Sequence, residues 1–108
     1  MEIKQIKQQL TKVDQIINRA TQAINDDIGA PQELKNYVQQ LDTQSKQARQ
    51  TLKHSKDEET LVQFIDQMEE TSDLAKKASE NSRNLGAQAK VAVGQVHRQL
   101  SDLKHQLH

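Results

Sequence analysis

The feature that most constrains the fold is a repeat in the second half of the chain. Across residues 61–107, apolar or small side chains recur at alternating steps of four and three residues. A strand repeats every two residues and a straight helix every 3.6, whereas an average step of about 3.5 is typical of helices packed side by side in a bundle or coiled coil. The repeat consists of Leu61, Ile65, Met68, Ser72, Ala75, Ser79, Ser82, Gly86, Ala89, Val93, Val96, Leu100, Leu103 and Leu107.

The first half of the chain carries the same repeat and divides into two predicted helices. The helix near residues 2–26 has the stripe Ile3, Ile6, Leu10, Val13, Ile17, Ala20 and Ile24. The helix near residues 31–53 has the stripe Leu34, Val38, Leu41, Ser45, Ala48 and Leu52. In the second stripe Ser45 is a polar interruption, so this is the weaker pattern.

Turn and cap residues separate these helices. The first helix should end before Pro31, because Gly29 tolerates the left-handed conformation of a C-terminal cap and proline cannot continue a helix without a kink. Ser55 can cap the third helix, and Glu58, three residues later, can complete a capping box.

The boundary between the third and fourth helices is open to two interpretations. Residues 80–86 contain several poor helix formers, yet the repeat passes through them without a break. If the chain turns there, helices lie near residues 57–80 and 86–107. If it does not, one helix of about 50 residues continues for about 75 Å. The two halves would then form a long kinked hairpin that dimerises into a four-helix bundle to cover its apolar surface.

The charge pattern favours the turn. Residues 55–80 contain eight acidic and three basic side chains, a net charge of −5, whereas residues 31–54 are +2 and residues 83–108 are +3. An acidic helix between two basic ones suits an up-and-down order. Charged residues seven positions apart predict three ion pairs, each contributing about 0.2–1 kcal/mol: Asp66–Lys104, Asp73–His97 and Glu80–Lys90.

We therefore predict an all-α, antiparallel up-and-down four-helix bundle in which residues 1–108 form a single domain. The repeat is made of small residues between Ser72 and Ala89, so the lowest local stability is expected there. The predicted core consists of Ile3, Ile6, Leu10, Val13, Ile17, Ile24, Leu34, Val38, Leu41, Leu52, Leu61, Ile65, Met68, Val93, Val96, Leu100 and Leu103.

Composition limits the function. Fifteen basic and 15 acidic side chains give a net charge of zero, so no overall field draws the molecule to nucleic acid or to an anionic membrane. The N-terminal residues lack the apolar stretch of a signal peptide, and no run approaches the roughly 20 apolar residues of a membrane span. The absence of cysteine excludes disulfides and allows a reducing compartment. We predict a cytoplasmic protein that does not enter membranes.

No arrangement of residues predicts an enzyme, a metal site or a cofactor site. His97, His105 and His108 fall on the outer face of the last helix, and the Glu-x-x-His pair of bundle metal sites does not occur. There is no Gly-rich phosphate loop, and Asp27 is the only carboxylate assigned to an interior position, at a helix end. We therefore expect no catalysis, no cofactor and no small-molecule substrate.

The remaining interpretation is a non-enzymatic helical module for protein–protein interaction or assembly, which binds a protein partner or associates with itself, for example as a dimer. Glutamine makes up about one residue in six and lines the polar faces. Amide groups are less costly to desolvate than charges, so such a face can join a partner helix. Alternatively, glutamine serves only as a good helix former on a wet surface.

A second interpretation uses a ladder of basic residues spaced seven apart on the last helix. Arg83, Lys90, His97 and Lys104 form this candidate interaction face, which could serve a nucleic-acid-associated accessory protein. The low number of arginines, the lack of aromatic rings for stacking and the matching acidic ladder argue against nucleic acid.

A third interpretation concerns His54. A four-helix bundle of this size resembles histidine phosphotransfer domains, in which the acceptor histidine stands in mid-helix within a stretch similar to His-x-Leu-Lys-Gly-Ser. The stretch Leu52-Lys53-His54-Ser55 has similar residues in a different order and lies at an expected helix end. This departure argues against His54 as an acceptor.

Overall fold

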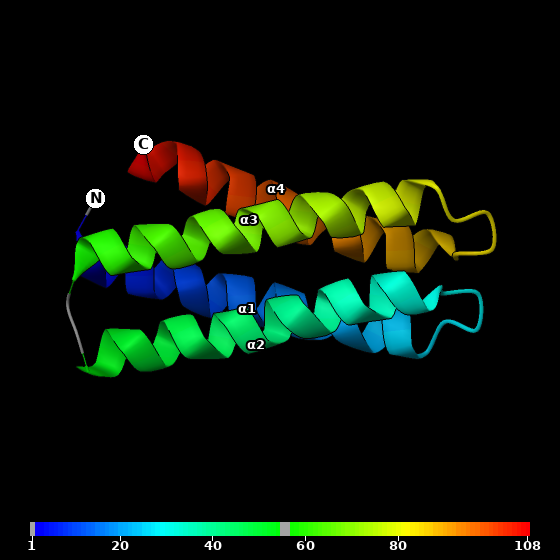
Figure 1. The fold of residues 1–108 in the computed structure, drawn as a ribbon, viewed down its shortest axis with the longest axis horizontal. Helices are drawn as coiled ribbons and strands as arrows, with labels where there is room; N and C mark the ends of the chain where they lie inside the picture. The colour runs from blue at the N-terminus through cyan, green and yellow to red at the C-terminus, as the bar shows by residue number, and fades with distance from the viewer. Residues whose placement is uncertain (1, 55–56) are drawn as a thin grey trace.

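In the computed structural model, which describes residues 2–54 and 57–108 apart from the side chain of Ile3, the first two apolar stripes each form one α-helix and the repeat across residues 61–107 forms two. The helices are α1 (Ile3–Asn25), α2 (Gln32–His54), α3 (Glu58–Glu80) and α4 (Ala87–Leu107). Each helix runs antiparallel to the one before it, and α4 packs against α1, so the helices close into a bundle (Figure 1). The predicted up-and-down four-helix bundle is confirmed.

The chain turns between α3 and α4, so the alternative of one continuous helix is wrong. The described part of the chain measures 42 × 22 × 18 Å, which is shorter than the roughly 75 Å of a 50-residue helix. Asn81 ends α3, and its N–H donates to the Lys77 carbonyl. Leu85, in the connection, is 6% exposed. Its burial anchors the connection in the core and removes the need for a dimer to cover a long hairpin.

The connection between α1 and α2 does not use the predicted left-handed glycine cap. Asp26 caps α1 in a right-handed conformation, and no glycine among the described residues has a positive φ. Gly29 instead lies against the α3–α4 connection, where a Cβ atom added to it would overlap the backbone oxygen of Asn84. Glycine is therefore required here because two loops approach closely, not because the turn is left-handed.

The start of α3 is capped by Asp57. Its carboxylate accepts a hydrogen bond from the Glu59 N–H (3.1 Å) and another from the Thr60 hydroxyl (2.8 Å). Glu58 is the first residue of the helix, so it does not occupy the third position that the predicted capping box requires, and that prediction is wrong. Ser55, its expected partner, lies outside the described residues.

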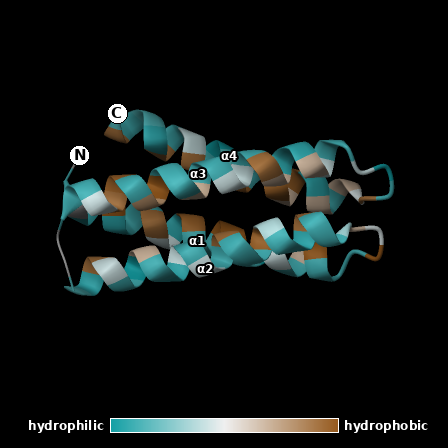
Figure 2. Ribbon diagram, viewed as in Figure 1, coloured by the Kyte–Doolittle hydropathy of each residue, from teal (hydrophilic) through white to brown (hydrophobic). Residues whose placement is uncertain are grey.

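The core extends along the bundle as two clusters of buried side chains (Figure 2). The larger cluster lies toward the end that holds the chain termini and includes Leu10 and Leu100. The smaller cluster lies toward the α1–α2 and α3–α4 loops and includes Ile24 and Leu34. All predicted core side chains that the structure describes are buried except Leu52, which is half-buried.

A second set of residues, absent from the predicted core, is also buried. They are small or polar residues on the helices, together with Ala30 and Leu85 from the loops. The set comprises Asp14, Ala20, Ala30, Ser45, Ala48, Thr71, Ser72, Ala75, Ser79, Leu85 and Ala89. In the part of the chain that the structure describes, no helix has an apolar stretch that could cross a lipid bilayer.

Candidate functional site

The predicted interaction face on α4 lies partly within the α3–α4 interface. Lys90, His97 and Lys104 follow one another at seven-residue intervals along α4, whereas Arg83 precedes the helix in the α3–α4 connection. His97 and Lys104 are partly buried against α3, and Lys90 and Arg83 are exposed. The structure therefore brings three of the four residues onto one face of α4, and two of these already contact α3.

The contacts of this face join α4 to carboxylates of α3. His97 Nε2 lies 3.5 Å from Glu69 Oε1 and 3.5 Å from Asp73 Oδ1, so the predicted pair Asp73–His97 is confirmed. Lys104 Nζ lies 3.4 Å from Glu69 Oε2. Sequence analysis missed Glu69, although its position directly after the buried Met68 places it at the edge of the interface.

The structure contradicts the other two predicted pairs, Asp66–Lys104 and Glu80–Lys90. Asp66 Oδ1 instead lies 2.9 Å from His108 Nε2, and Glu80 Oε1 lies 4.0 Å from Lys76 Nζ in its own helix. Residues seven apart on each helix fit several registers equally well, so spacing alone could not select the observed one.

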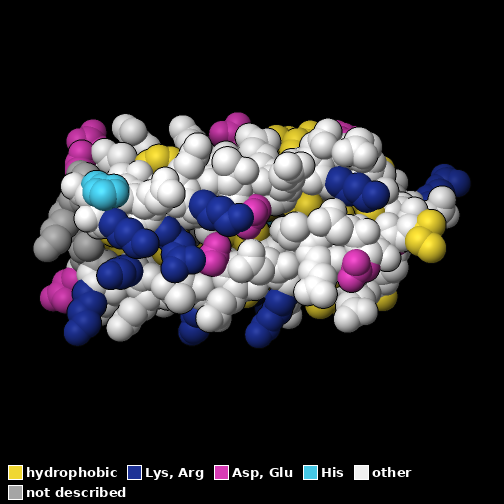
Figure 3. Space-filling view, turned by 90° about the horizontal axis from the view of Figure 1, so that it is seen from below, with side chains coloured by type: hydrophobic (Ala, Val, Ile, Leu, Met, Phe, Trp, Pro, Cys, Tyr) yellow, Lys and Arg dark blue, Asp and Glu magenta, His cyan; other side chains and the backbone are white. Residues whose placement is uncertain are grey.

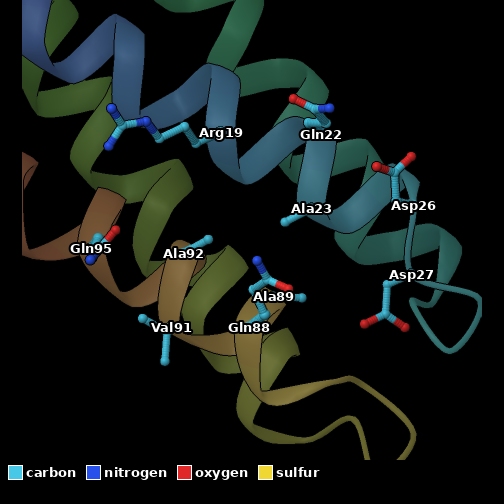
Figure 4. A pocket seen from close by; sticks show the side chains of 10 residues that line it. All are labelled: Arg19, Gln22, Ala23, Asp26, Asp27, Gln88, Ala89, Val91, Ala92 and Gln95. Atoms are coloured by element: carbon cyan, nitrogen blue, oxygen red, sulfur yellow. The ribbon is translucent and has the colours of Figure 1, made fainter.

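A groove of about 580 Å³ lies between α1 and α4, toward the loop end of the bundle. Figure 4 shows Ala23 from α1 and Ala89 and Ala92 from α4 lying between the two helices. Val91, which also lines the groove, is 60% exposed. The polar residues along its edges are Arg19, Gln22, Asp26, Gln88 and Gln95.

The edges of this α1–α4 groove keep their polar groups in solvent. Among the described residues, no hydrogen bond or ion pair joins helix α1 to helix α4. By contrast, α1 is joined to α2 through Asp14 and Arg49, and α3 is joined to α4 through Glu69 and His97. The α1–α4 groove therefore combines a floor of alanines with polar edges whose donors and acceptors remain available.

Asp27 closes the loop end of the α1–α4 groove. Its Oδ1 accepts a hydrogen bond from the Gly29 N–H (2.8 Å), and its Oδ2 accepts one from the Gly86 N–H (2.9 Å). Gly86 is the N-cap residue of α4, where a carboxylate also interacts favourably with the helix dipole. Asp27 therefore joins the two loops, and both of its oxygens are engaged.

Asp14 is a second interior carboxylate, so the assignment of Asp27 as the only one is wrong. The Asp14 residue is 9% exposed. Its Oδ1 accepts a hydrogen bond from the Ser45 hydroxyl (3.1 Å), and its Oδ2 accepts one from the Arg49 guanidinium (2.8 Å). The carboxylate holds α1 to α2 and presents no free acid to a substrate.

The histidines are dispersed. His54 is the last residue of α2 and is exposed, while His97 and His108 pair with carboxylates of α3. Within residues 2–54 and 57–108, no group of three or more potential ligands is arranged to hold a metal ion. The α1–α4 groove is therefore the candidate functional site that the geometry favours.

Comparisons of this chain with protein-family models, with curated proteins and with solved structures found no match.

Proposed function

We propose that this chain is a non-enzymatic helical interaction module that binds an amphipathic helix of a protein partner in the α1–α4 groove. One observation carries the proposal. The groove has a floor of alanines and, among the described residues, no hydrogen bond or ion pair joins its α1 edge to its α4 edge short of the Asp27 bridge at the loop end; the exposed Val91 also lines it. The hollow has a volume of about 580 Å³.

The edges of the groove match the periodicity of a helix. Arg19 and Asp26 stand seven residues apart on α1, and Gln88 and Gln95 stand seven residues apart on α4. A helix that lies along a bundle presents equivalent positions every seven residues. One docked helix could therefore contact both members of each pair, with charges of both signs on the α1 edge and amides on the α4 edge.

The floor of the groove suits a close approach by apolar side chains. Ala23, Ala89 and Ala92 occupy little volume, so a leucine or isoleucine of the partner can enter between α1 and α4. Covering the exposed part of Val91 would add about 1 kcal/mol of hydrophobic stabilisation. The partner we propose is therefore a helix with an apolar stripe and polar flanks.

The other interpretations have less support. Two members of the α4 ladder, His97 and Lys104, already contact carboxylates of α3, which weakens this face as a nucleic-acid site. His54 ends α2 instead of standing in mid-helix, unlike a phosphotransfer acceptor. The proposal keeps the predicted cytoplasmic location, which the absence of cysteine allows.

Site-specific photocrosslinking tests the proposal. A photoreactive amino acid at Gln95, on the edge of the groove, should crosslink one partner in native cells. The same group at Gln50, an exposed position on α2, should not crosslink that partner. The helical segment of the captured protein, made as a peptide, should bind the purified chain, and Ala92→Glu should weaken this binding at least tenfold.

Two results would contradict the proposal. The first is equal labelling of the same proteins from positions 95 and 50. The second is a captured segment that binds wild-type protein and the Ala92→Glu variant with the same affinity, because that segment would not occupy the groove.

A further inference from the structure

A cluster of basic side chains lies where α1 meets α2. Lys4 and Lys7 belong to the first turns of α1, and Lys46, Arg49 and Lys53 belong to the last turns of α2. Because the two helices are antiparallel, these residues meet at the same end of the bundle. Figure 3 shows lysine and arginine side chains gathered on one half of this side of the molecule. We call these five residues the basic face.

The charge of the basic face is only partly balanced. Arg49 pairs with Asp14 (2.8 Å), and Lys46 pairs with Asp42 (2.9 Å). The other three lysines are exposed and form no ion pair within the described part of the chain. With five cations and two carboxylates, the face attracts an anionic partner.

The surroundings of the basic face exclude two classes of anionic partner. Phe64 packs against the core, and Tyr37 lines a hollow with residues of α3, so neither ring of this chain can stack on a base at the basic face. The large apolar residues exposed elsewhere are Ile28, Leu74 and Val91. None of them belongs to the basic face, so the described residues offer this face no large apolar group to insert into a bilayer.

Among anionic partners, this leaves an acidic helix, and helix α3 of this chain is acidic. Helices α1 and α2 together carry eight basic and three acidic side chains, a net charge of +5, whereas α3 carries seven acidic and two basic, a net charge of −5. Glu59 and Asp66 of α3 stand seven residues apart, as do Lys46 and Lys53 of the basic face. Two helices with equal spacing can pair at every second turn.

We propose that the basic face binds the acidic edge of α3 from a second copy of this chain. The acidic edge consists of Glu59, Asp66 and Glu70; Glu59 and Glu70 are exposed, and Asp66 also pairs with His108 of its own copy. The basic face belongs to α1 and α2, whereas the acidic edge belongs to α3, so the contact joins two different surfaces. The contact is therefore heterologous, and it repeats from copy to copy instead of closing as a symmetric dimer. This assembly uses neither edge of the α1–α4 groove and is independent of the proposed partner helix.

Sedimentation of the purified chain tests the proposal. In low-salt buffer the average mass should rise above the 12.3 kDa of one chain as the concentration increases, and it should pass twice that value. At 1 M salt, where charges are screened beyond about 3 Å, it should return to the mass of one chain. A monomeric mass at every concentration in low salt would overturn the proposal.

Charge reversal identifies the two surfaces. The basic-face variant, Lys46→Glu with Lys53→Glu, should remain monomeric, and so should the acidic-edge variant, Glu59→Lys with Glu70→Lys. An equimolar mixture of the two should form a heterodimer and grow no further, because each variant keeps one intact surface. The control Lys90→Glu with Arg98→Glu changes the net charge as the basic-face variant does, and it should associate like the wild type.

Several outcomes would contradict this assignment. Association that survives in both variants would place the contact elsewhere, for example at the exposed Val91. Failure of the mixture to form a heterodimer would show that the two surfaces do not meet. Binding of duplex DNA or of phosphatidylserine vesicles by a monomeric wild type, lost in the basic-face variant, would reassign the face to another polyanion.

Discussion

Tyr37 forms a hydrogen bond with Glu33 one helical turn earlier, and this contact affects its ionisation. The Tyr37 hydroxyl donates to Glu33 Oε1 over 3.1 Å. This bond, followed by partial desolvation and the negative charge of Glu33, raises the pKa of Tyr37 above its ordinary value of 10.0. The chain has no other tyrosine and no tryptophan, so the absorbance of tyrosinate reports on this residue alone.

We expect Tyr37 to ionise above pH 10 in the folded protein and Glu33→Gln to lower its pKa toward 10.0. A raised pKa means that the folded state holds the proton more tightly. The contribution to stability is therefore complete below the pKa of the unfolded chain and is lost as the pH rises through the folded pKa. A spectrophotometric titration with identical midpoints for both proteins would contradict the assigned role of Glu33.

The Asp14 carboxylate should contribute measurably to stability. Asp14→Ala would leave the buried Ser45 hydroxyl and the Arg49 guanidinium without their partner, so we expect a loss of about 1–3 kcal/mol in the free energy of unfolding. Lys46→Ala, which breaks the exposed pair with Asp42, should cost less than about 1 kcal/mol. Urea denaturation of both variants compares the two, and equal losses would show that the buried network adds nothing.

The roles of single residues were the hardest to predict from the sequence. Ser45 counted as an interruption of the apolar stripe, because a stripe is judged by hydrophobicity alone. In the structure Ser45 is fully buried and donates to Asp14 across the α1–α2 interface. The two residues are 31 positions apart, so only the three-dimensional pairing of helices reveals the hydrogen bond that compensates for the polar group.

At the scale of helices and loops, replacing glycine by alanine should have opposite effects on stability at two positions. A Cβ atom at Gly94, within α4, would find no atom within 4 Å, whereas one at Gly29 would overlap the backbone of Asn84. Gly94→Ala should raise the free energy of unfolding by about 0.5–1 kcal/mol, because alanine restricts the unfolded chain. Gly29→Ala should lower it by about 1–3 kcal/mol, because the two loops must separate.

Thermal unfolding followed by circular dichroism measures both glycine variants under the same conditions. Stabilisation by Gly29→Ala would mean that the loops do not pack as closely as described. Destabilisation by Gly94→Ala would mean that the glycine has a steric role that its open surroundings do not show.

Helix positions could be predicted from the sequence because the apolar repeat and the turn residues agree. The repeat could not show whether the chain turns between α3 and α4, since Ser82 and Gly86 keep the phase of a continuous helix. The burial of Leu85 and the hydrogen bond from Gly86 to Asp27 depend on a loop that is distant in sequence. Cap residues were less predictable, because Asp57 and Ser55 are both good N-caps.

At the scale of the whole molecule, the candidate site depends on how each helix is rotated. The glutamines and alanines that line the α1–α4 groove form no distinctive sequence motif. The position of the groove depends on which sides of α1 and α4 face each other once the bundle has formed. The sequence predicted a polar face that can join a partner helix, but it could not show which interface between helices would receive that partner. The α4 ladder was offered as a candidate interaction face without knowledge of Glu69, which pairs with two members of that ladder.

The Asp27 bridge has a consequence for folding kinetics. Asp27 and Gly86 are 59 residues apart, whereas α1 with α2, and α3 with α4, can each form a hairpin from nearby segments. Contacts with large sequence separation carry a higher entropic cost before they form. We therefore expect the two hairpins to form early and the bridge to form after the main barrier has been crossed.

Asp27→Ala should then increase the unfolding rate roughly tenfold and leave the folding rate nearly unchanged. Asp26→Ala, which removes the neighbouring exposed carboxylate, should change neither rate appreciably. Stopped-flow measurements across a denaturant series separate the two rates. A slower folding rate for Asp27→Ala would place the bridge in the transition state. If the expected result holds, a carboxylate that contributes nothing to the speed of folding determines how long the folded bundle lasts.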